Sequence, residues 1–197
     1  MSEETVRGAL MAAEVAEQPA ALARLLDTQL VSINEVAAKV READPRFVLM
    51  CARGTSDHAA IYFKYLMEIQ LGLPVGLTSP STFTAYGARP KLDDVLWVSV
   101  SQSGGSPDLV DSTAAAREGG ALTVAVTNAP DSPLGQASEL NIDVAAGPER
   151  AVAATKSYTN QLLALWLLSD AMQGGDAAAA RTLPDFAQQV VDANEGA

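Results

Sequence analysis

A chain of 197 residues has room for one large domain or two small ones. Its 13 Lys and Arg against 24 Asp and Glu give a formal net charge of −11, which argues against binding to nucleic acids or anionic membranes. With 48% hydrophobic residues, no apolar run near the ~20 residues of a membrane span and an acidic start, Met1–Glu4, unlike a secretory signal, we expect a cytoplasmic protein with a buried core.

Residues 4–43 are rich in Ala, Leu and Glu, and their apolar positions recur every three or four residues, which predicts helix. Pro19 can open a helix at its first turn, and Asp44 with Pro45 ends the pattern. We therefore expect residues 1–45 to form an N-terminal helical segment that packs on the following domain.

From residue 46 onward, short apolar runs alternate with helical patterns. The apolar runs predict strands at 47–51, 75–78, 95–100, 122–126 and 140–144. The helical patterns lie at 57–71, 81–86, 107–118, 132–137 and 155–172. Strands that are apolar throughout indicate a sheet covered on both faces, and the strand–helix alternation indicates parallel pairing. The predicted fold of residues 46–172 is a three-layer αβα, flavodoxin-like, doubly wound sheet of five parallel strands in the order 2-1-3-4-5.

Residues 173–197 start with a Gly-containing turn and a run of alanines, and a further helical pattern begins at Leu183. That pattern has little apolar partner of its own. We expect the segment to be a linker toward an absent second domain.

Three loops that follow predicted strands carry polar residues. They span residues 52–58, 101–106 and 147–156. Ligands of open α/β sheets bind beyond the carboxyl ends of the strands, near the switch in strand order. The first two loops should therefore face one crevice.

The 101–106 loop has the composition of an anion cradle. Its glycines allow close backbone approach, and Ser101, Ser103 and Ser106 can donate hydrogen bonds to a phosphate without a basic side chain. Pro107 starts the next helix, whose free N–H groups would point into the crevice. The loop matches neither the P-loop nor GxGxxG, so nucleotide binding is not indicated. The alternative is that this Ser- and Gly-rich loop is simply a turn.

Four charged or titratable side chains near these loops have two interpretations each. Lys156 could stabilise an oxyanion or anchor phosphate, or it could face solvent; a helix N-terminus disfavours a cation, which favours the functional role. Glu149 could orient a hydroxyl or act as a base, or it could be a solvated carboxylate. Arg53 could bind phosphate or pair with an acidic neighbour, and His58 could cap the site but is expected to be a packing or surface residue.

The single cysteine, Cys51, excludes an intrachain disulfide and a cysteine-based zinc cluster. We expect it to be an inert buried thiol, and we expect Trp97 to lie in the core. With one histidine in the chain, no metal site is predicted.

Three ordered motifs resemble the sugar isomerase (SIS) domain family: Gly54-Thr55-Ser56, Ser101-Gln102-Ser103-Gly104 and Val152-Ala153-Ala154-Thr155-Lys156. They are similar to the first SIS domain in the isomerase half of glucosamine-6-phosphate synthase. The longer strings Arg53–Ala59 and Ala153–Tyr158 look closer to a synthase-related branch that contains glucosamine-6-phosphate deaminases. The resemblance runs from about Glu14 to about Asp170.

The resemblance implies a sugar-phosphate site, in which the 101–106 loop holds the phosphate and the 152–156 loop closes over the sugar. The implied substrate-binding residues are Gly54, Thr55, Ser56, Ser101, Gln102, Ser103, Ser106, Val152, Ala153, Ala154 and Lys156. Arg53 stands where the synthase typically has Cys, which fits the deaminase-like branch, and Gly105 stands where it has Glu.

The implied reaction opens glucosamine 6-phosphate, isomerises it and releases ammonia to give fructose 6-phosphate, with no cofactor. In the family, the ring-opening His, the enolising Glu and a C-terminal Lys belong to the second SIS domain. We therefore expect this chain to be the N-terminal half of an aldose–ketose isomerase or deaminase without a glutaminase domain, inactive alone. A second SIS domain and a homodimer partner would complete the site, and Glu149 and Lys156 are the only catalytic candidates here.

Two alternative functions remain open from the sequence. One is a non-catalytic sugar-phosphate-sensing SIS module, although residues 1–43 show no basic recognition helix. The other is an isomerase or deglycase acting on another amino-sugar phosphate.

Residues 158–168 are apolar almost all round a helix, which predicts burial in the core or at an interface. Because SIS domains characteristically pair, the resemblance implies a dimer.

Overall fold

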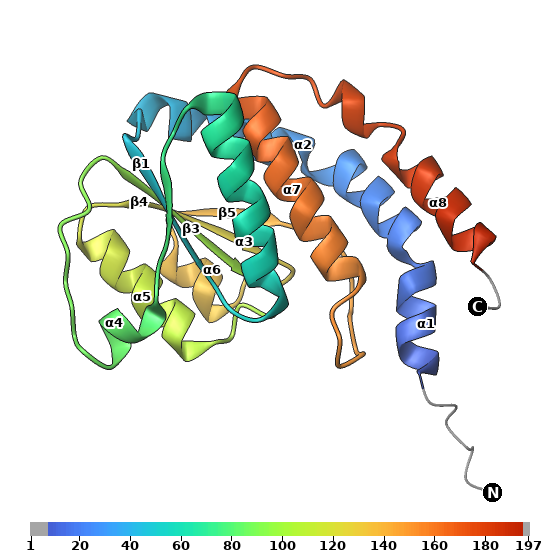
Figure 1. Cartoon of the computed structure of the whole chain (residues 1–197), viewed down its shortest axis with the longest axis horizontal. Coiled ribbons are helices and arrows are strands. Elements are labelled where there is room, and N and C mark those ends of the chain that lie inside the picture. The colour runs from blue at the N-terminus through green and yellow to red at the C-terminus, as the bar shows by residue number, and fades with distance from the viewer. Residues whose placement is uncertain (1–7, 195–197) are drawn as a thin grey trace, which may run out of the picture.

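The computed structural model describes residues 8–194, so the acidic start Met1–Glu4 lies outside the described residues. Five strands form one sheet with the order β2-β1-β3-β4-β5 (Figure 1), and all four neighbouring pairs are parallel. The strands are β1 (Phe47–Ala52), β2 (Val75–Leu77), β3 (Val95–Ser101), β4 (Leu122–Thr127) and β5 (Leu140–Asp143). The predicted strands, their parallel pairing and their order are confirmed.

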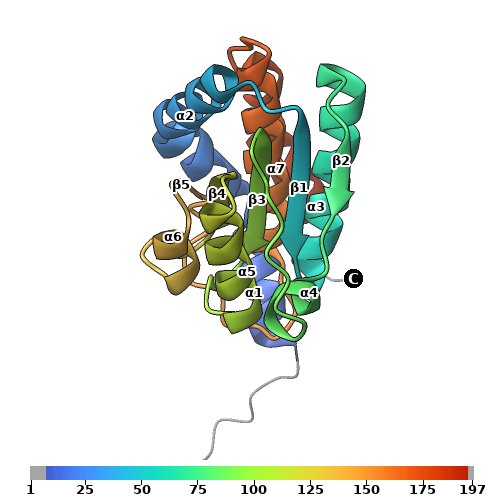
Figure 2. The ribbon, with the colours of Figure 1, turned by 90° about the vertical axis from the view of Figure 1, so that its left-hand side faces the viewer.

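Helices cover both faces of this sheet. On one side α2, α3 and α7 pack together, and on the other side lie α4, α5 and α6 (Figure 2). The helices are α1 (Ala9–Ala16), α2 (Gln18–Ala43), α3 (Thr55–Leu66), α4 (Pro80–Thr84), α5 (Pro107–Glu118), α6 (Pro133–Ala137), α7 (Lys156–Met172) and α8 (Leu183–Ala193). The three-layer αβα fold is therefore confirmed.

Two apolar cores flank the sheet because successive strand residues point to opposite faces. Val48 and Met50 of β1 join the core beneath α2, α3 and α7, whereas Cys51 joins the core beneath α5. Trp97 is fully buried in the second core, where its ring meets Phe83 edge-on at a centroid distance of 5.4 Å. Its indole N–H donates to the Ser99 hydroxyl at 2.8 Å, so the one polar atom of this core residue has a partner.

The N-terminal helical segment is two helices rather than one. The chain bends at Glu17, and Pro19 lies in the first turn of α2, where its missing N–H costs no hydrogen bond. The apolar stripe of α2 packs against α7, and α8 lies along α2 with its end near α1 (Figure 1). Residues 173–194 therefore form a turn, a short 3-10 helix (Ala178–Ala180) and α8.

Helix α3 differs from its prediction at both ends. It begins at Thr55, two residues early, and its last turn is a π-helix at Met67–Leu71 that stops at Gly72, which has a φ of +68°. Helix α7 lies mainly in the core between α2 and α3, and Trp166 is one of its partly exposed residues. Of the two predicted settings for this apolar helix, the structure shows the core.

Candidate functional site

The carboxyl ends of β1 and β3 lie side by side. Cys51 is in register with Ser99, and Ala52 with Val100, so α3 and α5 both begin at one edge of the sheet. This is the switch point of the strand order, where open α/β sheets bind ligands. It brings the first two predicted loops together.

The loop of residues 101–106, called the cradle below, connects β3 to α5. The buried Ser101 hydroxyl accepts the N–H of Gly104 at 3.2 Å, and the exposed Ser103 hydroxyl accepts that of Gly105 at 3.3 Å. Ser106 is the N-cap residue of α5, but its side chain makes no capping hydrogen bond. Gln102 is half-buried, and its carbonyl accepts the N–H of Asn128. The hydroxyl protons of Ser103 and Ser106 and the first turn of α5 can therefore donate to an anion.

The loop after β1 reaches α3 through Gly54, whose φ of +60° favours glycine. Thr55 is exposed and Ser56 is buried in the first turn of α3. The Arg53 guanidinium pairs with the carboxylate of Asp108, near the start of α5. Of the two interpretations of Arg53, the structure shows pairing with an acidic neighbour. The pair offsets a negative charge that would otherwise repel an anion at the cradle.

His58 is exposed, and it lies one turn along α3 from Gly54. Its position agrees with the surface role expected from the sequence.

Residues 147–155, called the β5–α7 loop below, connect β5 to α7 at the same edge of the sheet, beyond the carboxyl ends of the strands. Asn128, just after β4, fixes the start of the loop through two hydrogen bonds. Its Nδ2 donates to the Gly147 carbonyl and its Oδ1 accepts the N–H of Ala146, both at 2.8 Å. At the tip of the loop, Val152 and Ala153 are exposed and Ala154 is partly exposed.

Glu149 folds back onto the start of α7. Its carboxylate accepts the N–H of Thr155 at 2.9 Å, the N–H of Ser157 at 3.1 Å and both of their hydroxyls. Burial acts to raise the pKa of this carboxyl, but the hydrogen bonds from Ser157 and Thr155 outweigh it and hold the pKa of Glu149 below its ordinary value. A carboxylate with a lowered pKa is a weaker general base, so this geometry favours the capping of α7 over proton abstraction.

The lowered pKa predicts a pH dependence. The hydrogen bonds of Glu149 stabilise the fold above its ordinary pKa of about 4.5, and that contribution is lost as the pH falls toward the lower folded pKa. Glu149→Gln should therefore lower the free energy of unfolding by about 1–2 kcal/mol at pH 7, and by less at pH 3. Urea denaturation across this range measures the difference, with the exposed Glu139→Gln as control. A difference that stays constant with pH would contradict this role.

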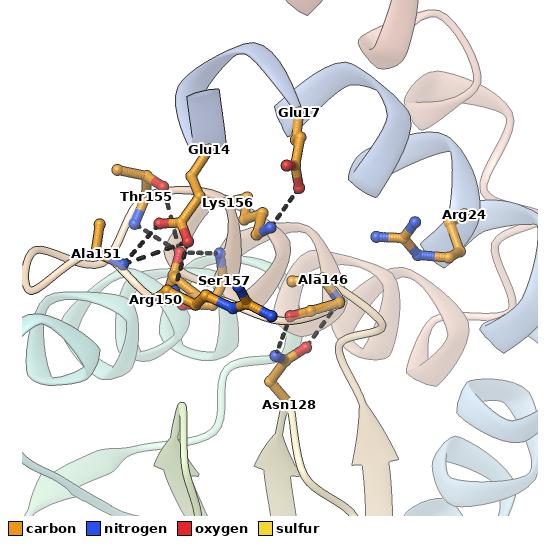
Figure 3. Close-up of polar contacts among 12 residues, drawn as sticks. Glu14, Glu17, Arg24, Asn128, Ala146, Arg150, Ala151, Thr155, Lys156 and Ser157 are labelled. Atoms are coloured by element: carbon orange, nitrogen blue, oxygen red, sulfur yellow. Dashed lines mark hydrogen bonds and ion pairs between the residues drawn. The ribbon is translucent and has the colours of Figure 1, made fainter. Parts of the chain in front are cut away.

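Lys156 is buried, with 1% of its surface exposed, and its ammonium group forms an ion pair with Glu17 at the bend between α1 and α2 (Figure 3). The solvent-facing alternative for Lys156 is therefore wrong. The pair also explains how a cation is tolerated at the N-terminus of α7, because Glu17 neutralises it. A contact between Lys156 and a substrate stays a prediction.

Sequence reasoning missed three residues that organise this edge: Asn128, Glu14 and Glu17. Asn128 stands at the end of a strand, as the other site residues do, and that position was its signal. The two glutamates contact residues more than 130 positions away, so no local sequence pattern indicated their role.

Cys51 is a free thiol and is buried, as expected, and burial raises its pKa to about 11, which disfavours the reactive thiolate. Within residues 8–194, no group of three or more His, Cys, Asp or Glu side chains is placed to hold a metal ion. The described helices include none long and apolar enough to cross a membrane.

Comparison with known sequences places this geometry in a family. Residues 43–170 match the SIS domain. The isomerizing glutamine–fructose-6-phosphate aminotransferase of Symbiobacterium thermophilum is 39% identical over 169 residues, covering 81% of this chain and 27% of that protein. The enzyme of the same name from Aquifex aeolicus is 37% identical over 159 residues, covering 81% and 26%. The chain thus spans about a quarter of the length of these curated relatives.

Solved structures show the same relationship. The structure of an inferred phosphosugar isomerase from Silicibacter pomeroyi DSS-3 is 43% identical in sequence and superposes with a TM-score of 0.88. The superposition covers 91% of this chain and 56% of that one. The C-terminal domain of glucosamine–fructose-6-phosphate aminotransferase from Francisella tularensis has the same fold, with 24% identity and a TM-score of 0.74 over 98% of this chain and 56% of that chain. The chain therefore belongs to the SIS domain family, and it is homologous to the SIS domains in the isomerase half of glutamine–fructose-6-phosphate aminotransferase.

Proposed function

We propose that this chain binds a sugar phosphate, glucosamine 6-phosphate or fructose 6-phosphate, with its phosphate in the 101–106 cradle. The observation that carries the proposal is the pairing of two helix N-termini, those of α3 and α5, at the switch point of the sheet. The cradle offers the hydroxyls of Ser103 and Ser106 beside the first turn of α5. A net charge of −11 makes a basic surface an improbable source of phosphate affinity, and these local donors replace it.

We further propose that the chain is the N-terminal half of an aldose–ketose isomerase or deaminase. Ring opening and enolisation need proton carriers with pKa values near neutrality. Here the one histidine, His58, lies exposed on α3, and Glu149 is engaged in capping α7 with a lowered pKa. Binding groups are thus better represented among the described residues than proton carriers, which supports the need for a second SIS domain.

A homodimer in the cytoplasm completes the proposal. An apolar groove between α1, α7 and α8, lined by Met11, Val15, Trp166 and Phe186, leaves part of α7 open to a second copy. Contiguous apolar surface of this kind is typical of protein–protein contacts.

The cradle is tested by calorimetry with glucosamine 6-phosphate. The Ser103→Ala, Ser106→Ala double variant should weaken binding about a hundredfold or more, because each hydrogen bond to a charged phosphate is worth roughly 1.5–3 kcal/mol. Its melting temperature should stay near that of the unsubstituted chain, since Ser103 is exposed and Ser106 is partly exposed. Ser32→Ala on α2 is the matched control.

An unchanged affinity in the double variant would place the phosphate elsewhere.

The 197-residue chain alone should release no ammonia from glucosamine 6-phosphate. Release of ammonia by the purified chain would contradict the assignment of proton transfer to a second domain.

A further inference from the structure

Two glutamates tie the junction of α1 and α2 to the β5–α7 loop. Glu14 is the buried residue of α1, with 5% of its surface exposed, and Glu17 occupies the bend that follows. Figure 3 shows both carboxylates turned toward residues 150–156. The contacts join segments separated by more than 130 residues.

The side chain of Glu14 holds the β5–α7 loop through backbone N–H groups of the loop. Its carboxylate accepts the N–H groups of Arg150 and Ala151, the second at 3.1 Å from Oε2. A carboxylate removed from water needs such donors. Displacing the loop would leave Glu14 buried without them, so α1 and the loop hold each other in place.

The tip of the loop depends on this contact. Within the described chain, the hydrogen bonds that join residues 150–154 to another element are those of Glu14. Val152 and Ala153 are exposed and contribute no apolar anchor. The inner part of the loop is fastened separately, by Asn128 at Gly147 and by Glu149 at Thr155.

Glu17 secures the far end of the same segment. Its carboxylate pairs with the buried ammonium group of Lys156, the first residue of α7. The two glutamates, three residues apart, therefore hold both ends of residues 150–156.

We propose that Glu14 and Glu17 are positioning residues of the phosphosugar site. They set the place of the β5–α7 loop over the sugar, while the cradle holds the phosphate. This inference rests on the proposed function. It predicts that a substitution of either glutamate weakens binding of the sugar part of the ligand but not binding of its phosphate.

The test uses the 197-residue chain with two probes, glucosamine 6-phosphate and inorganic phosphate, measured by calorimetry. Glu14→Ala should weaken binding of glucosamine 6-phosphate about tenfold or more and leave binding of inorganic phosphate unchanged. Glu14→Gln keeps one carbonyl acceptor and should fall between. Glu17→Gln, which leaves Lys156 without its counter-charge, should give the same selective pattern. Glu35→Ala, at an exposed position of α2, is the control.

Amide hydrogen exchange supplies a readout that does not depend on a ligand. Glu14→Ala should speed exchange at the amides of Arg150 and Ala151 without changing the strands of the sheet. Unchanged exchange at these two amides would overturn the inference, as would equal losses of both probes or no loss of either. Failure of the unsubstituted chain to bind either probe would overturn the proposed function instead, and the exchange result would still decide whether Glu14 holds the loop.

Discussion

A Gly104→Ala substitution should lower the free energy of unfolding by about 2–4 kcal/mol and abolish phosphosugar binding. Gly104 has a φ of +61°, where a side chain is strained, and an added Cβ would overlap the Ser132 hydroxyl and lie 2.6 Å from the Ser132 Cβ. Ser132 cannot easily yield, because it caps α6 by accepting the N–H of Gly135. The Gly104 carbonyl also accepts the N–H of Leu134 at 3.0 Å. The cradle would have to move away from α6.

The neighbouring glycine provides a matched control. Gly105 has no positive φ, and a Cβ there would meet only the Ser103 hydroxyl at 3.8 Å. Gly105→Ala should therefore change the free energy of unfolding by less than about 0.5 kcal/mol. Urea denaturation and calorimetry with glucosamine 6-phosphate measure both variants. If Gly104→Ala unfolded at the same urea concentration as the unsubstituted chain, the close packing of the cradle on α6 would be wrong.

Asn160→Asp should cost about 3–5 kcal/mol of unfolding free energy at pH 7. Asn160 is fully buried in α7, and its Nδ2 donates to the carbonyls of Ala21 at 3.0 Å and Val144 at 2.7 Å. These two bonds join α7 to α2 and to the end of β5. An ionised aspartate has no N–H group, so its carboxylate would face the two carbonyl oxygens and leave both without a hydrogen-bond donor.

The penalty for Asn160→Asp should shrink in acid. Burial would raise the folded pKa of the introduced carboxyl, so the penalty grows as the pH rises above its unfolded pKa of about 3.9. Thermal denaturation at pH 4 and pH 7 measures this change. Asn34→Asp is the control, since the exposed Asn34 donates only to the Leu30 carbonyl of its own helix and water can replace that bond. Equal stability of both variants at pH 7 would contradict the linking role of Asn160.

The fold could be predicted because its signals are local. The apolar runs of β1 and β3 mark strands covered on both faces, and Trp97 falls in the core as expected. Helix α5 spans its predicted residues, because Pro107 marks its start and Gly120, with a φ of +99°, follows its end. The π-helical turn at Met67–Leu71 was not predicted, since a local pattern does not distinguish it from the last turn of an α-helix.

The candidate site divides in the same way. The 101–106 cradle and the 52–58 loop were predicted as candidate site segments from residue type and from their place after strands, and the structure brings the two together. The partners of Arg53, Glu149 and Lys156 were not, because each depends on which segment the fold places beside them. Arg53 meets Asp108, and Lys156 meets Glu17 across 139 positions of sequence.

The strands, their parallel order and the hydroxyl-rich loop at the switch point could be predicted from the amino-acid sequence, because apolar periodicity and turn residues act within a few positions of the chain. The contacts of the charged residues in the third loop, Glu149 and Lys156, became visible only in the folded chain. Burial makes the charge of Lys156 costly unless a partner is supplied, and that partner, Glu17, comes from the bend between α1 and α2, 139 positions away. The local patterns in these 197 residues were thus enough to predict the fold. The contacts of Glu14, Glu17 and Lys156 join distant segments, so only the folded chain shows them.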